Sequence, residues 1–272
     1  MSLMNRPSVS CDALVLRSWP CGETSVIASL LTRDHGYVKV IAKAARRPKS
    51  SLRSLVEPGR LVSAEFGLEP GRELQYLRGG AVNLDPMTCA PDLERTAFLL
   101  GALELIDRCR PRDPFGPMAG GEGPAGGLFE VCEDFVRVLS SPACRRPDLV
   151  FFALEWELLR LHGLAPEVAV CAACGADPEE GGAPLQFALA AGGILCASCR
   201  PEGDARGGRA LSAAALDVLR LLAGGRVAVG EDVDFPRALR REIGAVLHGF
   251  LGYHLPGYRL PAALDLLRNR KD

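Results

Sequence analysis

Residues 36–60 read GYVKVIAKAARRPKSSLRSLVEPGR, and this stretch decides how the rest of the chain is interpreted. It begins with the two-residue period of a strand, because Tyr37, Lys39, Ile41 and Lys43 alternate with small apolar residues. The apolar face can pack on a core. The other face then presents an aromatic ring and two ammonium groups to solvent.

A basic loop follows this strand. Between Ala45 and Arg53 there are four cations, a proline, two serines and no acid. Across residues 36–60 the only acid is Glu57, in a chain whose formal net charge is −1. Such a local concentration of cations favours a polyanionic partner. The predicted binding residues are Tyr37, Lys39, Lys43, Arg46, Arg47, Lys49, Arg53 and Arg60.

The length and composition of the chain are those of a globular protein with more than one folded unit. With 272 residues, 48% of them hydrophobic, the chain can bury a full core and is expected to form two or three units. Residues 1–84 hold twelve cations and seven acids, so they carry +5 and the remainder carries −6. The N-terminus lacks the apolar segment of a signal peptide, and no apolar run approaches the ~20 residues of a membrane span. We expect a cytoplasmic protein that does not enter the membrane.

The first third of the chain has the pattern of a small β-barrel. Five runs of strand-forming residues are separated by turns rich in Gly, Pro and Asp, at residues 13–19, 25–32, 37–44, 60–66 and 73–79. Five strands without an intervening helical period predict a closed barrel. The OB-fold is the five-stranded barrel that most often binds nucleic acid. An SH3-like barrel fits the strand count nearly as well.

Beyond residue 85 the period changes to that of helices. Helices are predicted at residues 93–110, 128–141, 148–163, 211–225 and 236–254. Asp92 is the expected N-cap of the first helix, and Gly163 stands where a C-cap would. The Pro/Gly-rich connector 111–127 contains a G-x-G-x-x-G match, which we reject as a nucleotide site because no strand precedes it.

Two C-x-x-C pairs indicate a metal site. Cys171, Cys174, Cys196 and Cys199 give C-x₂-C-x₂₁-C-x₂-C, with Gly175 available for the tight turn of a knuckle. Four thiolates suit tetrahedral Zn²⁺ and leave no position open for water, so the predicted zinc is structural. The segment between the pairs resembles a hairpin. The alternative is a pair of redox-active dithiols.

These patterns together predict an α+β multidomain protein. Its parts are an OB-fold barrel at 1–84, a helical domain at 85–165 and 206–272, and a zinc-ribbon-like insertion at 166–205 that carries the four cysteine ligands. The chain has none of the P-loop, G-x-S-x-G or H-E-x-x-H motifs, and its four histidines are far apart in sequence. Nothing in the sequence indicates an enzyme.

The N-terminal motifs resemble a known family. Residues 23–25 (ETS), residues 31–33 (LTR) leading to Gly36, and above all residues 40–50 (VIAKAARRPKS) are similar to the N-terminal domain of the bacterial recombination mediator RecO. The order of barrel, helices, cysteine insertion and terminal helices agrees over nearly the whole length. Ala44 stands where the family usually has Gly, which suggests that the local backbone does not need a positive φ.

The resemblance implies a function in the RecF pathway of DNA repair and recombination. It implies binding of single- and double-stranded DNA by the barrel and annealing of complementary strands. It also implies contact with the acidic C-terminal tail of single-strand-binding protein, and a complex with RecR that helps to load RecA. A protein of this family would act in the bacterial cytoplasm at the nucleoid.

Three other functions remain open at this point. The first is an RNA-binding OB-fold and zinc-ribbon protein of the translation or transcription machinery, although RNA recognition usually uses more stacking aromatics. The others are a metal-dependent nuclease and a scaffold whose barrel binds protein.

Overall fold

The computed structural model describes residues 8–69, 71–89, 92–108, 124–178, 185–200, 208–225, 233–255 and 257–268. The chain divides into two compact units, Met1–Cys144 with Pro261–Asp272, and Arg145–Leu260. Residues 111–123 of the predicted Pro/Gly connector lie outside the described residues. The four-part domain division inferred from the sequence stays a prediction.

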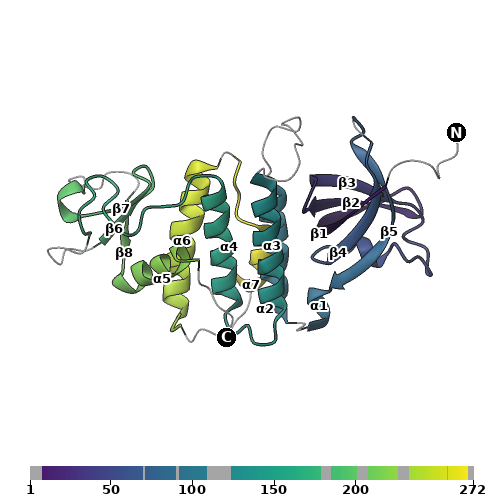
Figure 1. The fold of residues 1–272 in the computed structure, drawn as a ribbon. Coiled ribbons are helices and arrows are strands. Elements are labelled where there is room, and N and C mark those ends of the chain that lie inside the picture. The colour runs from purple at the N-terminus through teal and green to yellow at the C-terminus, as the bar shows by residue number, and fades with distance from the viewer. Residues whose placement is uncertain are drawn as a thin grey trace. The chain divides into compact units, whose positions relative to one another are not determined.

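The first unit begins with a closed five-stranded barrel (Figure 1). Its strands are β1 (Ser8–Cys21), β2 (Ser25–Thr32), β3 (Gly36–Ala42), β4 (Leu61–Gly67) and β5 (Leu74–Leu84). The closed order is β1-β2-β3-β5-β4, with β3 and β5 parallel and the other pairs antiparallel. This topology confirms the predicted OB-fold over the SH3-like alternative. All five predicted strands are present.

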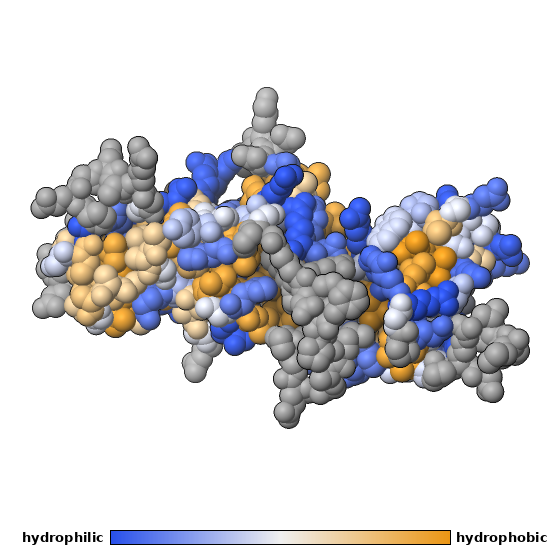
Figure 2. Space-filling model, turned by 90° about the horizontal axis from the view of Figure 1, so that it is seen from above, coloured by the Kyte–Doolittle hydropathy of each residue, from blue (hydrophilic) through white to orange (hydrophobic). Residues whose placement is uncertain are grey.

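Alternation along the strands fills the barrel. In β3, Val38, Val40 and Ala42 are buried, whereas the residues between them are partly exposed. Phe66 on β4 is completely buried in the same core. The outer surface is not uniformly polar, because Figure 2 shows apolar residues gathered on the visible face of the barrel with hydrophilic residues around them.

The connection between β3 and β4 is anchored in the barrel core. Ala45 is completely buried, Leu55 and Val56 are 3% exposed, and Leu52 packs against the same cluster. Leu55 and Val56 belong to a short 3-10 helix, η2 (Ser54–Val56). Hydrogen bonds inside the connection add to this anchoring, since the Ser50 N–H donates to the Arg47 carbonyl at 3.1 Å. The basic loop is therefore a structured part of the barrel.

Ala44 overturns one expectation from the sequence. Its φ is +58°, in the left-handed region that side chains disfavour, and β3 ends two residues earlier than predicted, at Ala42. This residue lies in the turn after β3, between exposed Lys43 and buried Ala45. The inference that this position does not need a positive φ is wrong.

Helices complete the first unit. They are α1 (Pro86–Cys89), α2 (Leu93–Arg108), α3 (Pro124–Ser140), η4 (Ala262–Leu264) and α7 (Asp265–Arg268). The Arg95 N–H donates to Oδ1 of Asp92 at 2.8 Å, which confirms the predicted N-cap of α2. The end of the chain returns to α2, where the Glu104 carboxylate accepts from the Ala262 and Ala263 N–H groups at 3.0 and 3.1 Å.

One arginine connects the barrel to α3. Arg33, just after β2, donates to Glu130 at 2.7 Å and to Glu133 at 2.6 Å. Its guanidinium carbon also lies 4.6 Å from the centre of the Phe129 ring. Burial acts to lower the pKa of Arg33, but the two carboxylates raise it overall. Arg33 therefore acts as a structural cation.

The second unit joins helices to a small sheet. It contains α4 (Pro147–Leu161), β6 (Leu185–Ala188), β7 (Gly193–Leu195), η3 (Ala197–Cys199), β8 (Gly208–Leu211), α5 (Ala213–Ala223) and α6 (Arg237–His254). The predicted hairpin is β6–β7, and β8, which was not predicted, adds to its free edge in the order β7-β6-β8. Gly163 has φ +69°, as expected for the residue that ends α4. Helices α5 and α6 pack on α4.

None of the described helices has both the length and the apolar character needed to cross a membrane.

The left-handed backbone of Ala44 predicts opposite effects for two substitutions. Ala44→Gly removes a conformational strain of about 1–2 kcal/mol but adds about 0.4–1 kcal/mol of unfolded-state entropy, so the protein should gain roughly 0.5 kcal/mol. Ala44→Val should lose at least about 1 kcal/mol, because a β-branched side chain tolerates positive φ poorly. Urea unfolding measures both. The neighbouring variant Ala45→Gly is the control and should be destabilised, and destabilisation by Ala44→Gly as well would contradict the positive φ.

Candidate nucleic-acid interface and candidate metal centre

Five predicted binding residues lie together in sequence after β3 and face solvent. Lys43, Arg46, Arg47, Lys49 and Arg53 are all exposed, and we call them the basic loop. Within the described part of the chain, no ion pair joins any of the five to a carboxylate. Their charges are therefore available to an external anion.

The basic loop lies beside the turn between β1 and β2. The Arg46 N–H donates to the Thr24 carbonyl at 2.8 Å, and Nη1 of Arg46 is 3.4 Å from the Gly22 carbonyl oxygen. Thr24 belongs to the first of the three motifs that carry the family resemblance. These contacts place two of those motifs next to each other in the fold.

The other three predicted residues are engaged within the protein. Lys39 pairs with Glu73. Arg60 lies 2.5 Å from Asp85 and 2.7 Å from Glu57, and its side chain is only 17% exposed. The Tyr37 hydroxyl donates to the Ile106 carbonyl of α2 at 3.0 Å. Their assignment to DNA contact stays a prediction.

Tyr76 is a residue near this loop that the sequence analysis did not select. The Nζ atom of Lys43 lies 4.8 Å from the centre of the Tyr76 ring, and the Arg72 guanidinium lies 4.6 Å from it. A hydrogen bond from Arg72 and the charge of Lys43 lower the pKa of Tyr76. The strand pattern of residues 73–79 contained this ring, but only the parallel pairing of β3 with β5 brings it beside Lys43.

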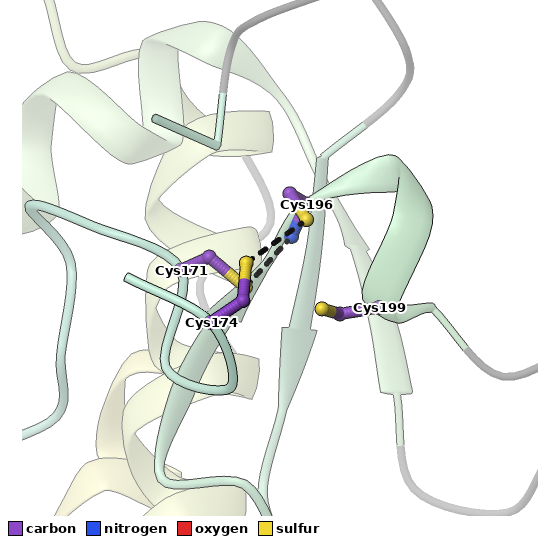
Figure 3. A group of neighbouring side chains, drawn as sticks. All are labelled: Cys171, Cys174, Cys196 and Cys199. Carbon is purple, nitrogen blue, oxygen red and sulfur yellow. Dashed lines mark hydrogen bonds between the residues drawn. The ribbon is translucent and has the colours of Figure 1, made fainter. Parts of the chain in front are cut away.

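The four predicted metal ligands converge on one point (Figure 3). The sulfur atoms of Cys171, Cys174, Cys196 and Cys199 all lie within 4.8 Å of one another. The Cys174–Cys196 sulfur distance is 3.7 Å. Tetrahedral Zn²⁺ with bonds of about 2.3 Å requires sulfur separations of about 3.8 Å. The four cysteines could therefore hold a metal ion.

Backbone geometry prepares the first pair of cysteines for an ion. Gly175 has φ +75°, and its N–H donates to the Cys171 carbonyl at 2.8 Å, which closes the predicted tight turn. The Cys196 N–H donates to the Cys171 sulfur at 3.3 Å. Burial acts to raise the pKa of Cys171, but N–H donors, that of Cys196 first, lower it to about 6. The site thus stabilises at least one thiolate before any metal binds.

Cys199 differs from Cys171 in the direction of its pKa shift. Hydrogen bonds with Cys174 and Cys196 raise the pKa of Cys199 to about 12. Crowded thiols with one low-pKa member are typical of a site that releases protons when a cation enters. The described residues of this cluster offer sulfur ligands only, and four of them would close a tetrahedron without a position for substrate.

The fold and these two sites define a multidomain protein with an OB barrel, a basic surface and a cysteine cluster. The N-terminal model of the family "Recombination protein O" matches residues 4–83, and its C-terminal model matches residues 90–263. The DNA repair protein RecO of Anaeromyxobacter sp. (strain K) is 34% identical over 93% of this chain and 94% of that protein. That of Desulforudis audaxviator (strain MP104C) is 30% identical over 94% of this chain and 95% of that protein.

The chain belongs to the RecO family of DNA repair proteins. That family is one of DNA repair mediators.

Proposed function

We propose that this protein binds single- and double-stranded DNA through its basic loop. We further propose that it anneals complementary strands and, together with RecR and single-strand-binding protein, promotes loading of RecA without being an enzyme itself. The observation that supports this proposal most is a loop of five exposed cations without carboxylate partners in the described chain, held by residues buried in an OB barrel. The protein would act in the cytoplasm, at the nucleoid.

The loop suits phosphates better than bases. Arginine and lysine side chains on a fixed backbone bind phosphate oxygens, which are alike in every sequence and in both single strands and duplexes. Each neutralised phosphate contributes a slope of about −0.7 to log K against log salt concentration for a single strand, and about −0.9 for a duplex. We therefore expect salt-sensitive binding with little sequence preference.

Annealing follows from the same charges. Two DNA strands repel each other through their phosphates, and a protein that neutralises several phosphates lowers that repulsion while the bases stay free to pair. Contact with RecR and with the tail of single-strand-binding protein rests on family membership.

The cysteine cluster is proposed to hold one structural Zn²⁺. Cys171, Cys174, Cys196 and Cys199 would coordinate it, with the Cys196 N–H as a supporting donor to the Cys171 sulfur. The ion would connect the loop that carries the first pair to the segment after β7.

Charge reversal in the basic loop tests DNA binding. The triple variant Arg46→Glu, Arg47→Glu, Lys49→Glu should bind a single-stranded oligonucleotide at least about tenfold more weakly, and its log–log salt slope should be about 2 units shallower. The same variant should anneal strands coated with single-strand-binding protein more slowly. Fluorescence anisotropy at several salt concentrations measures the affinity and the slope.

The matched control reverses three exposed arginines of the second unit, Arg160, Arg209 and Arg241, which changes net charge equally. It should keep the parent affinity and slope. An unchanged affinity and slope in the loop variant would contradict the proposal. Tighter binding of RNA than of DNA of the same sequence would favour the RNA-binding alternative, and degradation of labelled DNA with Mg²⁺ would favour a nuclease.

Removal of the metal tests the zinc proposal. The purified protein should contain one zinc ion per chain, and Cys174→Ala should lose it, whereas Cys21→Ala, which changes a cysteine outside the cluster, should retain it. A strong chelator should lower the melting temperature of the second unit and leave the oligonucleotide affinity of the basic loop unchanged. Metal analysis and thermal denaturation provide the measurements. Purified protein without zinc, together with a melting curve that chelation does not move, would show that the cluster is not a metal centre.

A further inference from the structure

Four partly exposed side chains form one row across the outside of the barrel. Trp19 on β1 pairs with Ile27 on β2, Ile27 pairs with Ile41 on β3, and Ile41 pairs with Tyr76 on β5. All four residues are intermediate in exposure. Adjacent strands lie about 4.8 Å apart, so the row is about 14 Å long. We call it the aromatic row, because an aromatic ring stands at each end.

The register explains why this part of the sheet is open. Along β2 and β3 the outward-facing pairs are Leu31 with Tyr37, Ser29 with Lys39, and Ile27 with Ile41. The pair of Leu31 and Tyr37 is covered, since Leu31 is completely buried and the Tyr37 hydroxyl donates a hydrogen bond to a carbonyl of α2. The third pair, four residues further along each strand, is partly exposed. The outer face therefore passes from a helix-covered end to an open apolar end.

Cations stand over both rings of the row. The Arg17 guanidinium lies 5.6 Å from the centre of the Trp19 ring. Lys43 and Arg72 lie 4.8 and 4.6 Å from the Tyr76 ring. Lys43 is also the first residue of the basic loop, so the row and the loop form one continuous surface at β3.

The acids near this surface are mostly paired. Glu73 pairs with Lys39, and Glu69 lies 3.4 Å from Arg72. Glu23, in the turn between β1 and β2, is exposed. Three cations at the rings and the other four of the basic loop leave the surface positive, so an anionic partner with flat apolar faces is the complementary one.

A single strand of DNA has both properties. Its unpaired bases present π-faces, and its phosphates follow at regular intervals. In a duplex the bases are stacked on each other and cannot reach the rings. An apolar helix of another protein would cover the two isoleucines, but it would leave Arg17 and Lys43, which lie over Trp19 and Tyr76, without counter-charges.

We propose that the aromatic row is a subsite for unpaired bases, with Trp19 and Tyr76 as stacking platforms and the basic loop holding the adjoining phosphates. This inference rests on the proposed function of the basic loop and adds a division of labour to it. The loop binds phosphates of single strands and duplexes alike, and the row supplies a preference for single strands.

Three ligands of equal length separate phosphate binding by the basic loop from base stacking on the aromatic row. They are an oligothymidylate, an abasic oligonucleotide with the same phosphates, and a duplex. Trp19→Leu and Tyr76→Leu should each weaken oligothymidylate binding about tenfold and leave abasic and duplex binding within about twofold of the parent. Trp19→Phe and Tyr76→Phe should retain most of the affinity because they keep a ring. Tyr253→Leu, at an exposed tyrosine on α6 of the second unit, is the matched control outside the row and should bind like the parent.

Tryptophan fluorescence gives a second readout that needs no variant. Of the two tryptophans, Trp156 is 2% exposed and Trp19 is partly exposed. Oligothymidylate should quench the emission of Trp19, and the abasic oligonucleotide should quench it far less.

The outcomes distinguish this inference from the proposed function. Leucine variants with parent affinity for oligothymidylate, or with equal losses for all three ligands, would overturn the subsite. In that case the triple variant of the basic loop would still test the proposed function. Its loss of affinity for all three ligands would support DNA binding by the loop. Equal quenching of Trp19 by the abasic ligand would also overturn base stacking.

Discussion

Burial of Ala45, Leu55 and Val56 in the barrel core is the constraint on which the proposed interface depends. These residues enter the core from a connection that otherwise carries cations, and burying such side chains contributes about 25 cal/mol per Å² of apolar surface removed from water. The chain between them has to turn outward, so the charged residues face solvent. Fixed cations lose less entropy on binding than mobile ones, which favours binding by this loop.

Some cations of the first unit are paired with carboxylates of the protein, and others are not. Arg33 and Arg60 have carboxylates within 2.8 Å and hold structure together. The cations of the basic loop have no carboxylate partner among the described residues. The two sites also lie in different units, since the basic loop belongs to the first and the cysteine cluster to the second. The proposed roles, binding by charge and stabilisation by coordination, therefore do not overlap.

The features that the sequence predicted correctly are those that depend on local periodicity and on the spacing of residues along the chain. The five strands, the N-cap Asp92 and the convergence of four cysteines all follow from patterns within a few residues, or from a spacing with one chemical interpretation. What it missed depends on pairing between distant segments. Tyr76 gains its cations only through the parallel β3–β5 pair, and Asp85 reaches Arg60 only because β4 and β5 are neighbours. Ala44 was misjudged because a missing glycine was taken to mean a relaxed backbone, whereas the fold imposes the turn on alanine.

The central claim is that DNA lies on the anchored basic loop of the barrel. Hydrogen–deuterium exchange of the full chain, with and without a single-stranded oligonucleotide, tests it without any substitution. We predict slower exchange in residues 43–56 and in the adjoining turn between β1 and β2, and unchanged exchange in α5 and α6. Protection confined to the second unit, with residues 43–56 unchanged, would contradict the account.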